Sequence, residues 1–242
     1  MRPPLSIAFA LTFGLSLAAL SVTALAQPSC RAVSGASVPT VVELYTSEGC
    51  NSCPPADHWL IELKSNKNVL RAAFHVDYWD RQGWRDRFGS AAYSARQAQS
   101  QRWSGARYSY TPQVQVNGQD WPQWPRLPDK PMPSMVDLSL VRGGDDIKVI
   151  ATARPGAPAH LSLWWAVLED GLWSSVRAGE NAGVTLRHDA VVRRYGTEAP
   201  WDSAHALDLV LPAPDPGLRL LVVVVDATTH QTAQALELSC PG

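Results

Sequence analysis

The stretch EGCNSCPPA, residues Glu48–Ala56, places two cysteines three positions apart and follows them at once with two prolines. The residues before it, TVVELYTS (Thr40–Ser47), are β-branched and apolar, which is typical of a strand. The residues after it, ADHWLIELKSN (Ala56–Asn66), carry large apolar side chains at helical spacing. A C-x-x-C pair at such a junction is a redox centre, half of a metal site, or a disulfide that stabilises a secreted protein.

The position of Cys50 and Cys53 between a strand and a helix favours redox chemistry. Free amides and the macrodipole at a helix N-terminus stabilise a thiolate, and a lowered thiol pKa permits attack on a partner disulfide near neutral pH. We expect Cys50 to attack and Cys53 to resolve the mixed disulfide. Pro54 and Pro55 suit a first helical turn, where amide hydrogens lack partners. This interpretation requires the pair to face an accessible cleft.

The N-terminus has the features of an export signal. Arg2 precedes a long apolar run, and the small residues Ala24–Ala26 offer a cleavage site. We interpret residues 1–26 as a signal peptide cleaved after Ala26, the alternative being an uncleaved membrane anchor. No other stretch is apolar over enough residues to span a bilayer, so we expect no stable membrane insertion after cleavage.

The four cysteines predict two disulfide bonds. An exported chain meets an oxidising compartment, in which paired thiols oxidise. Of the three possible connectivities, Cys50–Cys53 is the local choice, which leaves Cys30 and Cys240 to tie the two ends of the mature chain together. The formal net charge of −1 gives no sign of a basic face for nucleic acid.

The first half of the mature chain alternates strands and helices. After the strand and helix that flank the cysteines, the pattern predicts a strand over 69–79, a helix over 90–105 and a strand over 112–118. This order indicates an α/β unit, residues 38–118, with parallel pairing at its start.

The second half has a different pattern of prolines and apolar residues. Prolines recur every third residue within 119–134, at Pro122, Pro125, Pro128 and Pro131, which predicts a stiff polyproline connector; a ligand for an aromatic groove is the alternative. From residue 135 to 242, about seven short alternating runs with Pro and Gly between them predict an antiparallel β-sandwich.

Two further features belong to the predicted site. Thr111-Pro112 opens the strand over 112–118, and a cis peptide bond there would leave backbone groups free to pair with an extended peptide; an ordinary trans proline is the alternative. Glu43 lies on the strand that leads to Cys50, where a buried carboxylate could exchange a proton with the dithiol or simply be hydrogen-bonded at a sheet edge.

Residues of the 69–79 strand and the loop after it complete the candidate set. His75 and Asp77 alternate in FHVDYWD and line the site or support the loop through hydrogen bonds. Trp79 and Trp84 cap the site and bind the partner, or pack an aromatic loop.

These segments together resemble a known family. ELYTSEGCNSCPPAD, FHVDYWD, GWRDRF and YTPQVQVNG are similar to the exported bacterial proteins of domain of unknown function 1223. The resemblance implies a thioredoxin-like fold with Cys50 and Cys53 at the redox position and Thr111-Pro112 at the cis-proline position, and it supplies no function. The family continues after the VNG element into a helical stretch, whereas here the proline-rich segment begins at once.

The expected fold class is thus an α/β thioredoxin-like domain followed by an all-β antiparallel sandwich-like domain. The favoured function is an exported, periplasmic thiol–disulfide oxidoreductase that acts on a protein or small-molecule disulfide or dithiol, without cofactor or resident metal. One alternative is a binding or structural module with an inert disulfide, in which the β-domain does the work and the ten tryptophans of the chain serve ligand binding. The other is a Cu(I) carrier that uses Cys50, Cys53 and His75.

Overall fold

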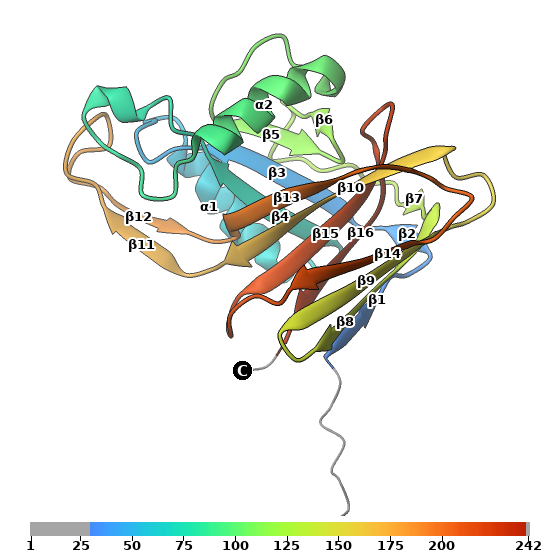
Figure 1. The fold of residues 1–242 in the computed structure, drawn as a ribbon. Helices are drawn as coiled ribbons and strands as arrows, with labels where there is room; N and C mark the ends of the chain where they lie inside the picture. The colour runs from blue at the N-terminus through green and yellow to red at the C-terminus, as the bar shows by residue number, and fades with distance from the viewer. Residues whose placement is uncertain (1–29, 241–242) are drawn as a thin grey trace, which may run out of the picture.

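The computed structural model describes residues 30–240, in which strands predominate and two α-helices occur (Figure 1). The predicted signal peptide, residues 1–26, lies outside the described residues. No helix of the described part combines the length and the apolar composition that a membrane crossing needs.

A sheet of eight strands forms the centre of the molecule. Its strands are, in spatial order, β16 (Thr232–Ser239), β15 (Arg219–Asp226), β10 (His160–Glu169), β13 (Val191–Asp202), β4 (Val69–His75), β3 (Thr40–Thr46), β5 (Gln113–Val116) and β6 (Gln119–Asp120). β3 and β4 are parallel, as expected for strands joined through a helix. β4 also pairs in parallel with β13, at Ala73 and Val191, and the remaining neighbours are antiparallel.

The predicted fold class is wrong, because strands of the second half extend the sheet of the first half. Ala73 N donates a hydrogen bond of 2.8 Å to Ala190 O at the join, so the backbone ladder continues across it. One apolar core also draws on both halves: Tyr45 and Phe74 pack with Trp164 and Leu221. The molecule is therefore a mostly β structure with a shared central sheet, and not an α/β domain followed by a separate sandwich.

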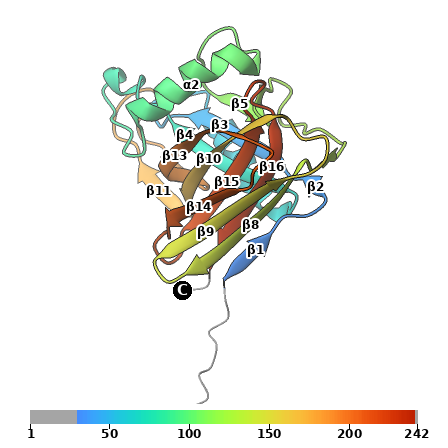
Figure 2. The ribbon, with the colours of Figure 1, turned by 45° about the vertical axis from the view of Figure 1, so that its right-hand side comes forward.

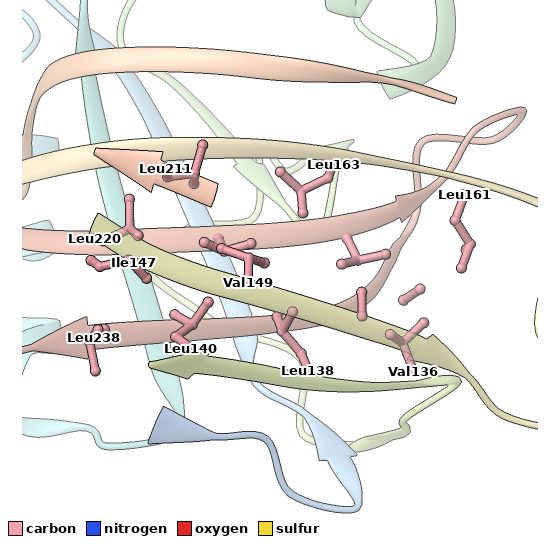
Figure 3. Close-up of a cluster of buried hydrophobic side chains, with 14 of the residues drawn as sticks. Val136, Leu138, Leu140, Ile147, Val149, Leu161, Leu163, Leu211, Leu220 and Leu238 are labelled. Atoms are coloured by element: carbon pink, nitrogen blue, oxygen red, sulfur yellow. The ribbon is translucent and has the colours of Figure 1, made fainter. Parts of the chain in front are cut away.

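A second sheet packs on one end of the first. Its strands are, in spatial order, β1 (Arg31–Val33), β8 (Val136–Gly143), β9 (Asp146–Ala153) and β14 (Leu207–Pro212). Leu138, Leu140 and Val149 from this sheet face Leu220 and Leu163 of the long sheet across a shared apolar core (Figure 3). Each such fully buried side chain contributes roughly 1.5–3 kcal/mol to folding, so this core ties the two sheets together.

The apolar run of β15 follows from its place between two cores. Leu220, Val222 and Val224 pack toward the second sheet, whereas Leu221 and Val223 pack on the opposite face. Because side chains alternate along a strand, a strand buried on both faces has to be apolar throughout.

The two helices cover opposite faces of β3 and β4. α1 (Pro54–Glu62) continues into the 3-10 helix η1 (Leu63–Ser65) and packs on the face that holds Leu44. α2 (Ala91–Ser104) follows the 3-10 helix η2 (Asp80–Gln82) and lies on the other face, across the upper part of the molecule in Figure 2. Ser90 Oγ caps α2 by accepting a hydrogen bond from Ala92 N, and the left-handed Gly105 ends it.

Two small ribbons complete the fold. β2 (Ser37–Val38) pairs with β7 (Met132–Pro133), and β11 (Leu172–Ser175) pairs with β12 (Thr185–His188) in a hairpin that packs against α1. The proline-rich segment is not extended throughout, because residues 122–125 form a turn in which the Trp124–Pro125 peptide bond is cis.

Candidate functional site

The cysteine pair lies in the loop between the end of β3 and the start of α1. Cys50 and Cys53 form a disulfide, and no described cysteine is free. Cys53 is the N-cap residue of α1 and already has helical backbone angles, with prolines in the first turn. The second predicted bond, Cys30–Cys240, is also present and joins residues 210 positions apart.

The disulfide is covered, which corrects the expectation of an accessible cleft. Cys50 and Cys53 are each 0% exposed, although Asn51 and Ser52 between them are exposed. The cover is the loop between β11 and β12, residues 176–184, which we call the covering loop. Its buried Asn181 donates hydrogen bonds of 2.9 Å to Glu48 O and to Cys50 O.

A third hydrogen bond joins the covering loop to the exposed residues between the cysteines. Asn51 N, at the exposed bend between the cysteines, donates a hydrogen bond of 3.2 Å to Glu180 Oε2. The covering loop belongs to the second half of the chain, and these three hydrogen bonds hold it against the cysteine loop.

A buried group of charged and polar side chains lies under the covering loop. Glu48 is fully buried, and its Oε2 accepts a hydrogen bond of 2.7 Å from Trp84 Nε1. His188 Nε2 lies 3.4 Å from Glu48 Oε1, outside hydrogen-bond geometry. Burial by itself raises the pKa of Glu48, but its contacts with His188 and Trp84 lower the pKa below its ordinary value, so this carboxylate is charged near neutral pH.

The second pair of the group is His75 and Asp86. His75 Nδ1 and Asp86 Oδ2 are 2.7 Å apart, and both side chains are almost completely buried. Burial by itself lowers the pKa of His75, but the Asp86 carboxylate raises it above its ordinary value. Burial by itself raises the pKa of Asp86, whereas His75 lowers it to about 2. The His75 and His188 rings meet edge to face with centroids 5.0 Å apart, which joins the two pairs.

Asp57 is the acid nearest to the cysteines along α1. It lies one helical turn after Cys53, whose carbonyl accepts a hydrogen bond of 3.1 Å from Asp57 N. Thr46 Oγ1 donates to Asp57 Oδ2 at 2.9 Å, and the side chain is buried. Burial raises the pKa of Asp57, so a proton on this carboxyl is retained to higher pH than on an exposed aspartate.

The predicted Thr111-Pro112 element is connected to the cysteine loop through Trp79. The Thr111–Pro112 peptide bond is cis, and Trp79 Nε1 donates a hydrogen bond of 2.8 Å to Thr111 Oγ1. A Cβ added at Gly49 would lie 3.0 Å from the Trp79 Cβ. Gly49 therefore allows the close approach of Trp79 to the cysteine loop.

Two predicted site residues lie elsewhere. Glu43 Oε2 is 2.5 Å from Arg96 Nη1, on the face of β3 that α2 covers, whereas Thr46 faces α1. Asp77 Oδ1 accepts a hydrogen bond of 2.5 Å from Ser94 Oγ, which supports the start of α2. His75, Trp79 and Trp84 do lie around the cysteine loop.

Within residues 30–240, no group of three or more His, Cys, Asp or Glu side chains is arranged to hold a metal ion. His75, the third ligand of the Cu(I) alternative, bonds to Asp86 through Nδ1, and its Nε2 has no hydrogen-bond partner among the described residues.

Comparison with protein-family models finds one family that matches most of the chain. The model of DUF1223, described as a protein of unknown function, matches residues 41–226, which include both cysteines and the covering loop. The chain belongs to the DUF1223 family. No curated protein matches it.

Two solved structures share the fold of this DUF1223 chain. One is the crystal structure of protein AGR_C_4864 from Agrobacterium tumefaciens, with 24% identity and a TM-score of 0.65; the match covers 85% of this chain and 96% of that one. The other is HBP35 of Porphyromonas gingivalis, with 12% identity and a TM-score of 0.58, over 84% of this chain and 75% of that one. At these identities, the similarity concerns the fold alone.

Sequence reasoning about this DUF1223 chain missed most of the buried group. Glu48 begins the opening motif and Asp57 directly follows it, so their nearness to the cysteines in sequence was a usable signal. Asp86 stands in GWRDRF, one of the segments that carry the family resemblance. His188 gave no signal, because it lies among β-strand residues far along the chain and reaches the site only through the β11–β12 hairpin.

Proposed function

We propose that the DUF1223 chain carries out thiol–disulfide exchange through Cys50 and Cys53, in an oxidising compartment outside the cytoplasm, and that the covering loop must open first. The observation that carries the proposal is a disulfide at the start of α1 with a buried acid, Asp57, one helical turn further on. The helix N-terminus favours thiolate, and the acid handles the proton that accompanies exchange.

The reaction uses a partner dithiol as its second reactant. A partner thiolate attacks Cys50 Sγ, the Cys50–Cys53 bond breaks, and Cys53 leaves as a thiolate. Asp57 gives Cys53 a proton. The second partner thiol then attacks the partner sulfur of the mixed disulfide and releases Cys50, so the partner is oxidised by two electrons and the cysteine pair is reduced by two. The same steps run backwards when the reduced pair meets a partner disulfide.

Access to Cys50 depends on a few hydrogen bonds. Asn181 donates to two backbone carbonyls beside the disulfide, and Asn51 N donates to Glu180. Each such bond contributes about 1 kcal/mol net, so transient opening of the loop is within the range of local fluctuations.

The complete burial of both cysteines favours a second candidate function. In it, the Cys50–Cys53 bond is inert and helps to hold the cysteine loop, and the protein acts as a binding or structural module. A reduction potential distinguishes the two candidates. Structural disulfides lie below about −300 mV, and exchanging ones lie above.

Trapping tests the proposal directly. We expect Cys53→Ser, expressed with its export signal, to accumulate mixed disulfides through Cys50, because the resolving thiol is absent. Cys50→Ala/Cys53→Ala is the control for adducts at Cys30 or Cys240. A potential below about −300 mV together with no trapped partner supports the inert disulfide instead.

The covering loop has its own test. Asn181→Ala removes both hydrogen bonds to the cysteine loop, and we expect dithiothreitol to reduce Cys50–Cys53 roughly tenfold faster. Val184→Ala, on the exposed end of the same hairpin, is the matched control. An unchanged rate in Asn181→Ala would show that the loop does not limit access.

A further inference from the structure

A second site lies on the opposite face of β3, between α2 and the sheet. It is a cavity of about 240 Å³ lined by α2, by β3, β5, β10 and β13, and by the turn between β15 and β16. We call it the α2 cavity. It shares none of its lining residues with the buried group under the covering loop.

The α2 cavity contains a buried ion pair within aromatic walls. The Arg96 guanidinium is bound by Glu43 and by the Tyr45 hydroxyl, both through Nη1. Its Cζ lies 4.4 Å from the centre of the Phe74 ring, and the rings of Trp164 and Tyr195 are at 4.9 and 5.1 Å.

The Nε–H donor of this arginine is not used by the ion pair. Arg96 Nε is buried and has no hydrogen-bond partner among the described residues. An unpaired buried donor is costly, but this atom is too enclosed for a group in the cavity to reach it without movement of the Arg96 side chain.

The surface between α2 and the sheet is polar, which is unusual for a helix packed on a sheet. The buried Ser100 of α2 and the buried Gln115 of β5 line the cavity, and Gln115 Nε2 donates a hydrogen bond of 2.7 Å to Ser100 Oγ. Hydroxyl and amide groups around the cavity therefore offer both donors and acceptors.

Aromatic side chains form one boundary of the α2 cavity. Trp103 at the end of α2 stacks on His230 in the β15–β16 turn, with ring centroids 3.8 Å apart and planes 20° apart. Gly118 allows this arrangement, since a Cβ at that position would lie 2.3 Å from His230 O. This stack joins α2 to the turn beside the cavity.

The charges of the cavity favour an uncharged ligand. Arg96 and Glu43 neutralise each other, and burial lowers the pKa of His230, so its ring is neutral at neutral pH. Burial by itself lowers the pKa of Arg96, but Glu43 raises it, so the pair remains charged. Glu198 adds a carboxylate at the cavity, which disfavours anions.

We propose that the α2 cavity binds a neutral polyhydroxylated ring, that is, a monosaccharide or a terminal sugar unit. Sugar hydroxyls exchange hydrogen bonds with the carboxylate, hydroxyl and amide groups that line the cavity, and the C–H groups of the ring pack on aromatic side chains, whose faces carry negative charge density. The volume is below the roughly 300–1,000 Å³ of pockets for drug-sized molecules, so a single ring is the appropriate size.

Titration of the disulfide-intact protein tests this site. The probes are glucose, galactose, mannose, xylose and N-acetylglucosamine, followed by isothermal calorimetry and by tryptophan fluorescence, because Trp103 and Trp164 line the cavity. We expect at least one sugar to bind saturably at one site, and at least tenfold more tightly than acetate or glutamate. Failure of all five sugars, or tighter binding of an anion, overturns the proposal.

Matched variants locate the binding. Ser162→Phe fills the α2 cavity from β10, and we expect it to weaken sugar binding at least tenfold, whereas Ser139→Phe on β8 leaves it unchanged. Trp103→Ala provides a second test at the cavity edge, and circular dichroism verifies the fold of each variant. Equal binding in Ser162→Phe and the wild type excludes the α2 cavity. Cys50→Ala/Cys53→Ala should bind sugar normally, so failure of this proposal leaves the redox proposal untouched.

Discussion

The two disulfide bonds of this DUF1223 chain constrain it in different ways. Cys30 precedes β1 at the edge of the four-stranded sheet, and Cys240 follows β16 at the edge of the eight-stranded sheet, so their bond joins the two sheets beside a shared apolar core. Cys50–Cys53 joins residues three positions apart. The first bond limits the unfolded chain more than the second, because it closes a much longer loop.

The length of the loop that each bond closes gives an estimate of its contribution to stability. In the chain-entropy model, a loop of 210 residues corresponds to about 5 kcal/mol of stabilisation, whereas a loop of three residues corresponds to about 2 kcal/mol. The surroundings differ as well, because Cys50–Cys53 lies beside the buried ionisable side chains of the site, whereas Cys30 and Cys240 pack against the shared apolar core. Under the proposed function, the long-range bond serves stability and the short-range bond serves chemistry.

The largest expected effect is on the long-range bond. We expect Cys30→Ala/Cys240→Ala to lower the free energy of unfolding by about 5 kcal/mol, because the unfolded chain regains its freedom. Urea denaturation without reductant measures it. A loss below about 1 kcal/mol would mean that the shared core alone holds the two sheets together.

The buried pair near the short-range bond comes next. We expect Asp86→Asn to lose about 3 kcal/mol at pH 7, because the buried pair with His75 is broken and a neutral amide replaces the carboxylate that accepts from Glu48 N. Since the pKa of Asp86 is depressed from 3.8 to about 2, wild-type stability from this group is present above about pH 4 and lost as the pH falls toward 2. Denaturation curves from pH 2 to pH 7 should show this loss in the wild type and not in Asp86→Asn.

Removing the short-range bond should cost less. We expect Cys50→Ala/Cys53→Ala to lower the free energy of unfolding by about 2 kcal/mol or less, because the closed loop is short. The same urea measurement compares it with the Cys30/Cys240 variant. A loss as large as that of the long-range bond would contradict the division between stability and chemistry.

The smallest expected change in the free energy of unfolding is an increase, in the variant Asp57→Asn. Burial raises the pKa of Asp57, so the folded state holds this proton more tightly, and stability from it is lost as the pH rises through the folded pKa. Asp57→Asn keeps an acceptor for Thr46 and removes the buried charge, so we expect a gain on the order of 1 kcal/mol at pH 8.

The same variant should slow exchange with a dithiol at least tenfold, because a positioned acid is missing. Thermal unfolding at pH 5 and pH 8 measures the stability change, and stopped-flow mixing with dithiothreitol measures the exchange. A stable variant with unchanged exchange would remove Asp57 from the mechanism.

Local patterns predicted the elements around the site well. The strand before the cysteines, the helix after them and the alanine-rich helix correspond to β3, α1 and α2 within a few residues. These predictions succeeded because side-chain periodicity and capping residues such as Ser90 and Gly105 act over a few positions.

Local patterns could not predict which strands from distant parts of the chain pair with one another. Nothing in residues 69–75 or 191–202 indicates that β4 and β13 pair in parallel, since an apolar strand satisfies its hydrogen bonds equally well with many neighbours. The separation of the two halves into an α/β unit and a sandwich was therefore wrong. Asn181 illustrates the same limit: it bonds to Glu48 O across 133 positions of sequence.

The sequence by itself determined where the disulfides, helices and strands lie, because cysteine spacing, periodicity and caps are local properties. Only the tertiary structure decided that Glu43 faces Arg96 and that His188 and Asp86 lie beneath the cysteine loop. It also decided that the disulfide is covered. The physical reason is that the burial and the charge environment of a side chain depend on which distant segment packs over it, and that choice is made by the whole folded chain.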